Sequence, residues 1–173
     1  MTKDAGEIGI LLLNLGGPDS LEAVRPFLFN LFSDREIIRL GPSFMQKPLA
    51  YLIATLRHKK TESYYRLIGG KSPIFEITNT QAMALEEGLN ASPFTFHLSR
   101  PLKVFIGMRY WHPLIETTVP EIFHRGIRRV IALGLYPHYS IATIGSSFSK
   151  MKEAVSRFPM EVFTISSWHD HPL

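Results

Sequence analysis

The chain contains no cysteine, which excludes disulfide bonds, thiolate metal ligands and cysteine nucleophiles within its 173 residues. It also lacks any apolar run of the roughly 18 residues that a membrane-spanning helix needs. The stretch up to Glu7 is short and polar, so we expect no targeting signal and a cytoplasmic protein. No internal repeat, low-complexity tract or linker interrupts the sequence, which predicts a single domain.

The excess of one sign of charge is small as well. The net charge is +4, which suits an anionic ligand or an acidic membrane surface. This excess is too small and too scattered to predict a nucleic-acid partner. Hydrophobic residues make up 45% of the chain and charged residues 20%, the balance of an ordinary soluble globular domain with a real core.

Four short apolar runs, bounded by glycine or proline, predict strands that are buried on both faces. They span residues 8–15, 103–110, 129–136 and 161–166. Helical spacing of apolar residues between them predicts helices over residues 20–32, 43–56, 73–89, 113–125 and 146–158. This alternation predicts an α/β fold with a four-stranded parallel sheet flanked by helices. Right-handed crossovers would connect the strands.

The carboxyl ends of these strands are where ligands of open α/β sheets bind. They lie at residues 16–18, 109–112, 136–140 and 167–169, and three of the four are rich in aromatic, histidine or arginine side chains. We expect the segments after the second and third strands to be neighbours. Their aromatic content favours a large flat ligand over a simple phosphate, and the long insertion over 20–102 should also carry function.

The turn at residues 14–18 (NLGGP) is either a tight strand-to-helix turn or a loop that approaches a ligand closely. It lacks the Gly-x-Gly-x-x-Gly spacing and the Lys-Ser/Thr pair of phosphate-binding loops. A nucleotide-binding domain is therefore the least favoured alternative.

Two apolar helical stripes stand inside the insertion. The first comprises Phe27, Leu28, Leu31 and Phe32, and the second Phe44, Met45, Leu49, Leu52, Ile53 and Leu56. The default interpretation is core. The alternative is an exposed lip around a hydrophobic ligand or against a membrane, because a four-stranded sheet needs less apolar surface than this. The basic run at 57–60 predicts a solvated face, or beside such a lip a site for carboxylates or lipid headgroups.

The segments that contain histidine are the remaining candidates for a functional site. The segments 109–113 (RYWHP) and 136–140 (YPHYS) combine arginine, aromatics and histidine at the ligand edge, which makes a site as plausible as a structural role. The triplet 169–171 (HDH) would place two rings on one face of a strand. It lacks a third ligand, so we assign no metal site there. No Ser-His-Asp or paired-carboxylate arrangement is defined by spacing.

Five motifs, in this order, resemble the ferrochelatase family, whose members insert ferrous iron into a porphyrin. They are LLNLGGP at 12–18, FL and LFSDR within 27–35, YRLIGGKSPI at 65–74, GMRYWHP at 107–113, and YPHYS at 136–140 with Thr143 and GSS at 145–147. Each motif alone is weak, but the ordered set is specific and covers essentially the whole chain.

The resemblance implies one of two similar Rossmann-like halves that hold a porphyrin in the cleft between them, with a helical lip insertion at about residues 20–72. It assigns Leu15, Leu28, Leu31 and Phe32 to the macrocycle, Arg57 and Ser72 to propionates with Tyr65 nearby, and Arg109 and Tyr110 to the pocket floor. Tyr136, His138, Ser140 and Ser147 are further substrate-binding residues. Apolar side chains suit the ring, and arginine and hydroxyl groups suit carboxylates.

The family distorts the porphyrin and removes two protons as Fe²⁺ enters, so iron is a substrate. The proton-accepting histidine stands in a Ser-x-His-Ser-Leu-Pro segment of the second half, with a partner glutamate there. This chain has no such segment, so we assign it no catalytic residue. The cysteines that bind an iron–sulfur cluster in some members would likewise lie beyond Leu173.

We therefore expect a lyase-class chelatase of heme biosynthesis without its C-terminal half, acting on protoporphyrin IX or coproporphyrin III. The expected location is the cytoplasm, with peripheral contact to the inner membrane. The alternative is a standalone porphyrin-binding module that inserts no metal.

Overall fold

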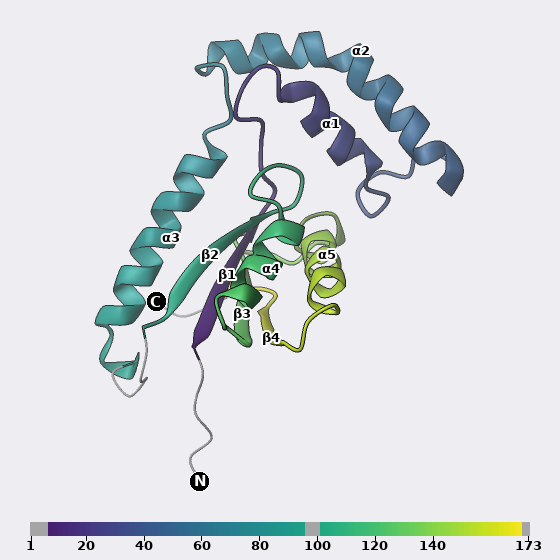
Figure 1. Cartoon of the computed structure of the whole chain (residues 1–173). Helices are drawn as coiled ribbons and strands as arrows, with labels where there is room; N and C mark the ends of the chain where they lie inside the picture. Colours follow the sequence, from purple (N-terminus) through teal and green to yellow (C-terminus); the bar gives the residue numbers. More distant parts are fainter. Residues whose placement is uncertain (1–6, 96–100, 171–173) are drawn as a thin grey trace.

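The computed structural model describes residues 7–95 and 101–170 and contains a four-stranded sheet (Figure 1). The strands are β1 (Ile8–Asn14), β2 (Lys103–Met108), β3 (Arg129–Gly134) and β4 (Glu161–Ile165). All three strand pairs are parallel, in the order β2-β1-β3-β4. The predicted α/β, Rossmann-like parallel sheet is therefore confirmed.

The expected adjacency of the segments after the second and third strands is wrong at the level of the sheet. β1 lies between β2 and β3 and pairs with both. The chain reaches this order because the long insertion carries β2 to one side of β1, and the next crossover returns the chain to the other side. β1 is thus the central strand, which explains its uninterrupted apolar sequence.

The helices follow the predicted order with shifted ends. They are α1 (Val24–Ser33), α2 (Gln46–Leu67), α3 (Ile74–Ala91), α4 (Ile115–His124) and α5 (Ser146–Val155). Short 3₁₀ turns span Ser43–Met45 and Pro93–Thr95, and one π-helical turn, Ile141–Gly145, precedes α5. That turn was not predicted.

Helix α2 runs well beyond its predicted end at Leu56, so the basic run at 57–60 lies in its middle. The residues that follow the apolar stripe include no glycine or proline and are mostly good helix formers. The helix ends where Gly69 and Gly70 adopt φ values of +93° and +82°. The Gly70 amide donates to the carbonyl oxygen of Tyr65 at 2.8 Å, which closes the last turn.

Three apolar clusters set the layers of the molecule. One lies between the sheet and helices α4 and α5, and a second joins the opposite sheet face to α3. The third joins α1 and α2 to each other and to Tyr110. Figure 1 shows this helix pair beyond the carboxyl ends of the strands, while α3 and the α4–α5 pair flank the sheet. The helical insertion therefore stands over the edge where a ligand is expected.

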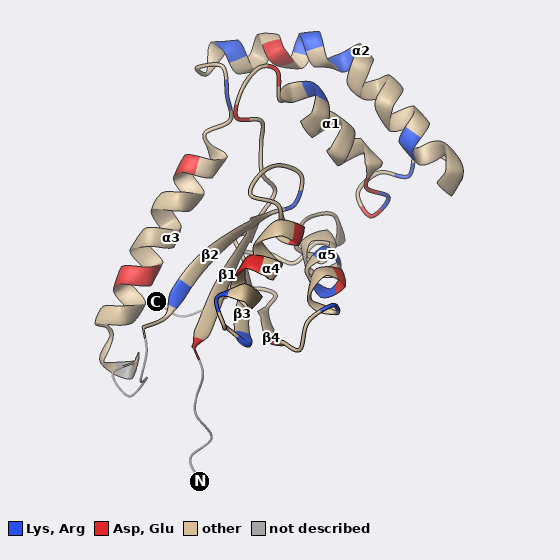
Figure 2. Ribbon diagram, in the orientation of Figure 1, with Lys and Arg blue, Asp and Glu red and all other residues tan. Residues whose placement is uncertain are grey.

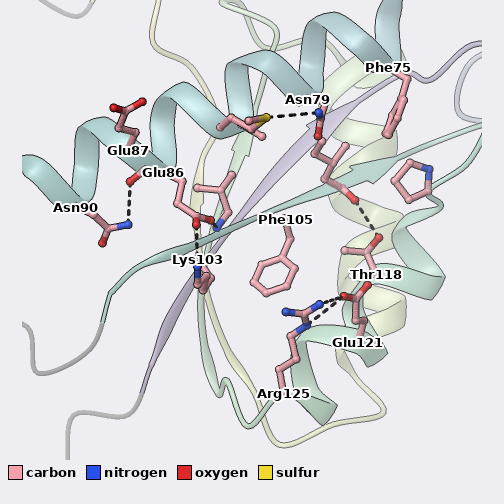
Figure 3. Close-up of a pocket in the computed structure, with 15 residues that line it drawn as sticks. Phe75, Asn79, Glu86, Glu87, Asn90, Lys103, Phe105, Thr118, Glu121 and Arg125 are labelled. Carbon is pink, nitrogen blue, oxygen red and sulfur yellow. Dashed lines mark hydrogen bonds and ion pairs between the residues drawn. The ribbon is translucent and has the colours of Figure 1, made fainter.

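A cavity of about 710 Å³ lies between α3 and α4 over the outer edge of β2 (Figure 3). Side chains of α3 form hydrogen bonds with backbone groups of β2 and of Leu102, the residue before it. Asn90 bonds both the amide and the carbonyl of Leu102, at 2.8 and 3.0 Å, and Glu86 accepts from the Val104 amide at 2.8 Å. These bonds protect the edge against pairing with another strand. None of the predicted site residues lines this cavity.

Candidate functional site

A buried carboxylate joins three segments at the carboxyl edge of the sheet. Asp34 follows α1, Arg109 and Tyr110 follow β2, and Ser146 begins α5. One carboxylate oxygen, Oδ2, accepts hydrogen bonds from Arg109 Nη2, the Tyr110 hydroxyl and the Ser146 hydroxyl, each at 2.6 Å. Arg109 Nε also donates to Ser146 Oγ at 2.8 Å. We call these four residues the Asp34 cluster.

The electrostatics of the Asp34 cluster favour an ionised carboxylate. Burial by itself raises the pKa of Asp34, but donors oppose this. The hydroxyls of Ser146 and Tyr110, the amide of Glu36 and the charge of Arg109 together bring that pKa below its ordinary value of 3.8. Burial, together with the hydrogen bond to Asp34, raises the pKa of Tyr110. The cluster therefore holds a fixed ion pair at neutral pH.

The backbone brings the Asp34 cluster to this edge by extending the ladder between β1 and β2. The amides of Arg109 and Tyr110 donate to the carbonyls of Asn14 and Leu15, both at 2.9 Å. Asn30 of α1 donates to the Tyr110 carbonyl at 3.1 Å. The lip helix is thus attached to the sheet at the point where Arg109 leaves it.

An apolar wall built by α1 and α2 adjoins the cluster through Tyr110. Its buried members are Val24, Phe27, Leu28, Phe32, Ala50, Ala54 and Tyr110, and its partly buried members include Leu15, Leu31, Tyr65 and Trp111. Leu28 and Phe32 are enclosed between α1 and α2, whereas Leu15, Leu31 and Tyr65 keep surface that a ligand could contact. The wall gathers all of the predicted macrocycle residues.

The default interpretation of the second apolar stripe as core is wrong for three of its members. Phe44 is 76% exposed, Leu52 51% and Leu56 72%. Helix α2 buries Ala50 and Ala54 against α1 instead, because small side chains allow the two helices to approach closely. The alternative, an exposed apolar lip, describes this face of α2.

Two polar residues of α2 border the wall. The guanidinium of the exposed Arg57 lies 5.7 Å from the centre of the Phe32 ring. Tyr65 is half-buried in the same cluster, and burial raises the pKa of its hydroxyl. Charge and apolar surface are therefore adjacent on this helix.

The turn after β1 packs tightly against Ser72. The Ser72 amide donates to the Pro18 carbonyl at 2.8 Å. A Cβ atom at Gly17 would lie 2.5 Å from Ser72 Oγ, so only glycine fits there. A cavity of about 460 Å³ opens beside Gly17, Ser72 and Trp111. The turn thus has a structural role in holding the insertion, and Ser72 faces a space open to a ligand.

The remaining predicted residues do not join the Asp34 cluster. Tyr136 packs against the α4–α5 core, where burial raises its pKa to about 12. Ser147 is buried and donates to the Thr143 carbonyl at 3.2 Å. His138 and Ser140 are exposed on the segment after β3.

The histidines near β4 form no complete ligand set among the described residues. The His169 ring lies 4.4 Å from the His138 ring, centre to centre, and its Nδ1 is 2.6 Å from Ser167 Oγ. His169 lies in a turn after β4 and not on a strand, and His171 lies outside the described residues. Within 7–95 and 101–170, no three histidine or carboxylate side chains are grouped as metal ligands.

Asp34 and Ser146 are the functional candidates that the sequence did not predict, although both stand inside recognised motifs. Asp34 is 75 residues from Arg109 and 112 from Ser146, so no local spacing relates them. The available signal was an acidic residue directly after an apolar helix, at a position where it would be buried.

The ferrochelatase family model matches residues 7–173. The chain is 51% identical over 171 residues to a ferrochelatase of Synechocystis sp., covering 96% of this chain and 43% of the relative. It is 49% identical to one of Gloeobacter violaceus, covering 96% and 50%, and 51% identical to one of Geotalea uraniireducens, covering 95% and 49%. The chain thus spans half or less of the length of these relatives.

Proposed function

The chain belongs to the ferrochelatase family, and on that premise we propose that it supplies porphyrin-binding walls to an enzyme that inserts Fe²⁺ into a porphyrin in heme biosynthesis. The observation that carries this proposal is the apolar α1–α2 wall, which shares Tyr110 with the Asp34 cluster. A porphyrin presents an apolar ring and charged propionates, and such a ligand needs both kinds of surface.

Each group would have a distinct role in binding. Leu15 and Leu31 would contact the ring, with Leu28 and Phe32 supporting them from behind, and the Tyr65 hydroxyl would lie near the propionates. Arg57 and Ser72 would bind propionates through charge-assisted hydrogen bonds. We assign Tyr136, His138, Ser140 and Ser147 to the rim of the pocket, at the ends of the strands.

Arg109 would orient the substrate and not accept its protons. It remains a cation, and Asp34 holds it through one short hydrogen bond and through Ser146. Asp34 in turn is fully engaged by its donors, which makes it a poor base. We therefore propose that the proton acceptors lie in the part of the relatives' length that this chain does not match.

Replacing Arg57 with alanine, or Tyr65 with phenylalanine, should weaken porphyrin binding without unfolding the domain. Loss of a charge-assisted bond costs roughly 1.5–3 kcal/mol when it is shielded, and the exposure of Arg57 favours the lower end, about a tenfold weaker Kd. Titration of the porphyrin Soret band measures this change. Arg66→Ala is the matched control, because Arg66 is another exposed arginine of α2. Unchanged affinity in both variants would remove these residues from the site.

Helix α2 also supports a peripheral membrane contact. No helix in the described part of the chain is long and apolar enough to span a membrane. The exposed Leu52 and Leu56 precede the exposed Lys59 and Lys60 by one to two turns of the same helix. Apolar side chains followed by basic ones are typical of interfacial helices.

We expect the chain to cosediment with phosphatidylglycerol vesicles at low salt and to dissociate as salt is added, because screening weakens the basic contribution. Phosphatidylcholine vesicles, which carry no net charge, should bind less. Lys59→Gln with Lys60→Gln should lower the salt dependence, while Leu52→Ser with Leu56→Ser should lower binding at every salt concentration. Absence of cosedimentation with the anionic vesicles at low salt would contradict this contact.

A further inference from the structure

Two histidines meet where the third and fourth strands end. β3 and β4 are paired in parallel, so their carboxyl ends emerge side by side. His138 lies on the segment after β3 and His169 in the turn after β4, and the centres of their rings are 4.4 Å apart. Both side chains are exposed, so this contact does not fill a core. A pair of exposed imidazoles at the ligand-binding edge of an α/β sheet is a candidate metal site.

The two segments are tied together, which fixes the distance between the rings. The Trp168 amide donates to the Pro137 carbonyl at 3.1 Å, and the Trp168 indole Nε1 donates to the Gly134 carbonyl at 2.9 Å. The Ser167 hydroxyl donates to the same Pro137 carbonyl at 3.4 Å. Each histidine directly follows a residue that takes part in these bonds, so the pair is positioned before any ion binds.

Hydrogen bonding also leaves one nitrogen of His169 free for a metal ion. His169 Nδ1 is 2.6 Å from Ser167 Oγ. A hydroxyl has one proton to donate, and Ser167 donates it to Pro137, so Ser167 accepts from the Nδ1–H of His169. The Nε2 atom of His169 then carries the lone pair. Histidines that bind metals have this arrangement, in which a hydrogen-bond acceptor holds the second ring nitrogen.

The spacing of the rings suits one shared ion. A bond between a divalent transition metal and an imidazole nitrogen is about 2.1 Å long, which places two rings at neighbouring corners of an octahedron with their centres about 4.5 Å apart. The observed separation is 4.4 Å, and the ring planes are 39° apart and not stacked flat. Within the ranges that the structure describes, no third histidine or carboxylate completes the set. Water would therefore fill the other positions.

The charges on the two segments do not oppose a cation. Residues 135–149 and 158–170 contain no lysine or arginine, and the acidic Asp170 directly follows His169. Basic residues stand on α2 and α5, outside the segments that carry the two histidines (Figure 2). Neither segment therefore brings a positive charge that would repel a metal ion.

We propose that His138 and His169 bind one divalent transition-metal ion, with water in the remaining positions. Ser167 is a positioning residue, because it holds the His169 ring and leaves Nε2 free. Among divalent first-row metals, Cu²⁺ binds nitrogen ligands most tightly and accepts right-angled positions with nitrogen and oxygen donors, so it is the probe. The site requires no porphyrin, so it can fail or hold independently of the function proposed above.

Titration of the 173-residue chain with Cu²⁺ alone tests the site. One ion should bind more tightly than any other, and its electron paramagnetic resonance spectrum should show coupling to two imidazole nitrogens. His138→Gln and His169→Gln should each weaken this binding at least about tenfold and leave coupling to one nitrogen, because one of two protein ligands is lost. His124→Gln is the matched control, since His124 is also exposed but its ring contacts Phe123 and Phe158 instead of another histidine.

A second pair of variants tests the positioning role of Ser167. Ser167→Ala should weaken Cu²⁺ binding about tenfold, the lower end of the effect of such hydrogen-bond partners. Ser167→Thr keeps the hydroxyl and should retain the affinity. Coupling to two nitrogens should persist in both variants. Equal affinities of Ser167→Ala and the unmodified chain would remove Ser167 from the site.

Three outcomes would overturn the metal site itself. One is Cu²⁺ affinity that is unchanged in both His138→Gln and His169→Gln. Another is affinity that is lost in His171→Gln but kept in His138→Gln, which would assign the ion to the triplet 169–171. The third is binding that appears only as the chain associates, detected by sedimentation, since the ion would then bridge two copies.

Discussion

Replacing Asp34 with alanine is expected to lower the free energy of unfolding by about 3–5 kcal/mol, because it leaves a mostly buried cation without its partner. The Arg109 side chain is 17% exposed and loses its bond to Asp34. The hydroxyls of Tyr110 and Ser146 lose the same acceptor. Urea unfolding at neutral pH measures the loss. Domains of this size are stable by only about 5–15 kcal/mol, so a large part of the total is involved.

Two variants isolate the cause of this loss. Asp34→Asn keeps the shape and one acceptor oxygen, so its loss should be smaller and should report the charge. Glu153→Ala removes an acid that is 57% exposed and paired with Lys150, and it should change the free energy of unfolding far less than Asp34→Ala does. Equal losses for Asp34→Ala and Glu153→Ala would contradict a structural role for the Asp34 cluster.

The same carboxylate predicts a pH dependence with a defined sign. The pKa of Asp34 is lower in the folded chain than its ordinary value, so the unfolded chain binds the proton first as the pH falls. Its stabilising contribution is therefore complete above about pH 4 and is lost as the pH falls through the lower folded pKa. The difference in unfolding free energy between the unmodified chain and Asp34→Asn should shrink in that acidic range. A difference that stays constant would show that Asp34 has no lowered pKa.

The purified chain, mixed with a porphyrin and a divalent metal, is expected to give metalloporphyrin no faster than the uncatalysed reaction. A single wall cannot exclude water from both faces of the ring, which weakens binding. No base in this chain is placed over the ring by any recognised motif, and Arg109 and Asp34 hold each other as an ion pair. Zn²⁺, which is not oxidised in air, allows the rate to be followed by absorbance alongside Fe²⁺.

Supplying the unmatched portion of the Synechocystis sp. ferrochelatase should restore metallation if the two polypeptides dock. Binding without metallation, both alone and in that mixture, would favour the standalone porphyrin-binding module. Metallation by the 173-residue chain alone, above background, would falsify the assignment of proton acceptors to a second half.

The parts of the candidate site that follow directly from local sequence were predictable. Arg109 and Tyr110 come after an apolar run that ends the second strand, so their place at the sheet edge follows from strand direction alone. The partners of these two residues were not predictable. Asp34 and Ser146 reach them from distant segments, through a crossover geometry that no spacing in one sequence encodes.

The apolar stripes show the same difference between what local sequence predicts and what packing decides. Helical periodicity marks Leu52 and Leu56 as one face of a helix, but it cannot say whether another element covers that face. The structure leaves them exposed, because α2 uses Ala50 and Ala54 to contact α1. The apolar run of β4 likewise predicts burial on both faces, yet Phe163 and Ile165 are exposed.

The sequence by itself determined the order of elements, the parallel sheet and the family, because these depend on periodicity, turn residues and contiguous motifs. Tertiary structure alone decided which strands are neighbours, which apolar faces are covered and which acid pairs with Arg109. The physical reason is the distance along the chain over which each effect acts. Backbone preference and amphipathicity act within a few residues, whereas burial and ion pairing depend on groups that meet only when distant segments pack together.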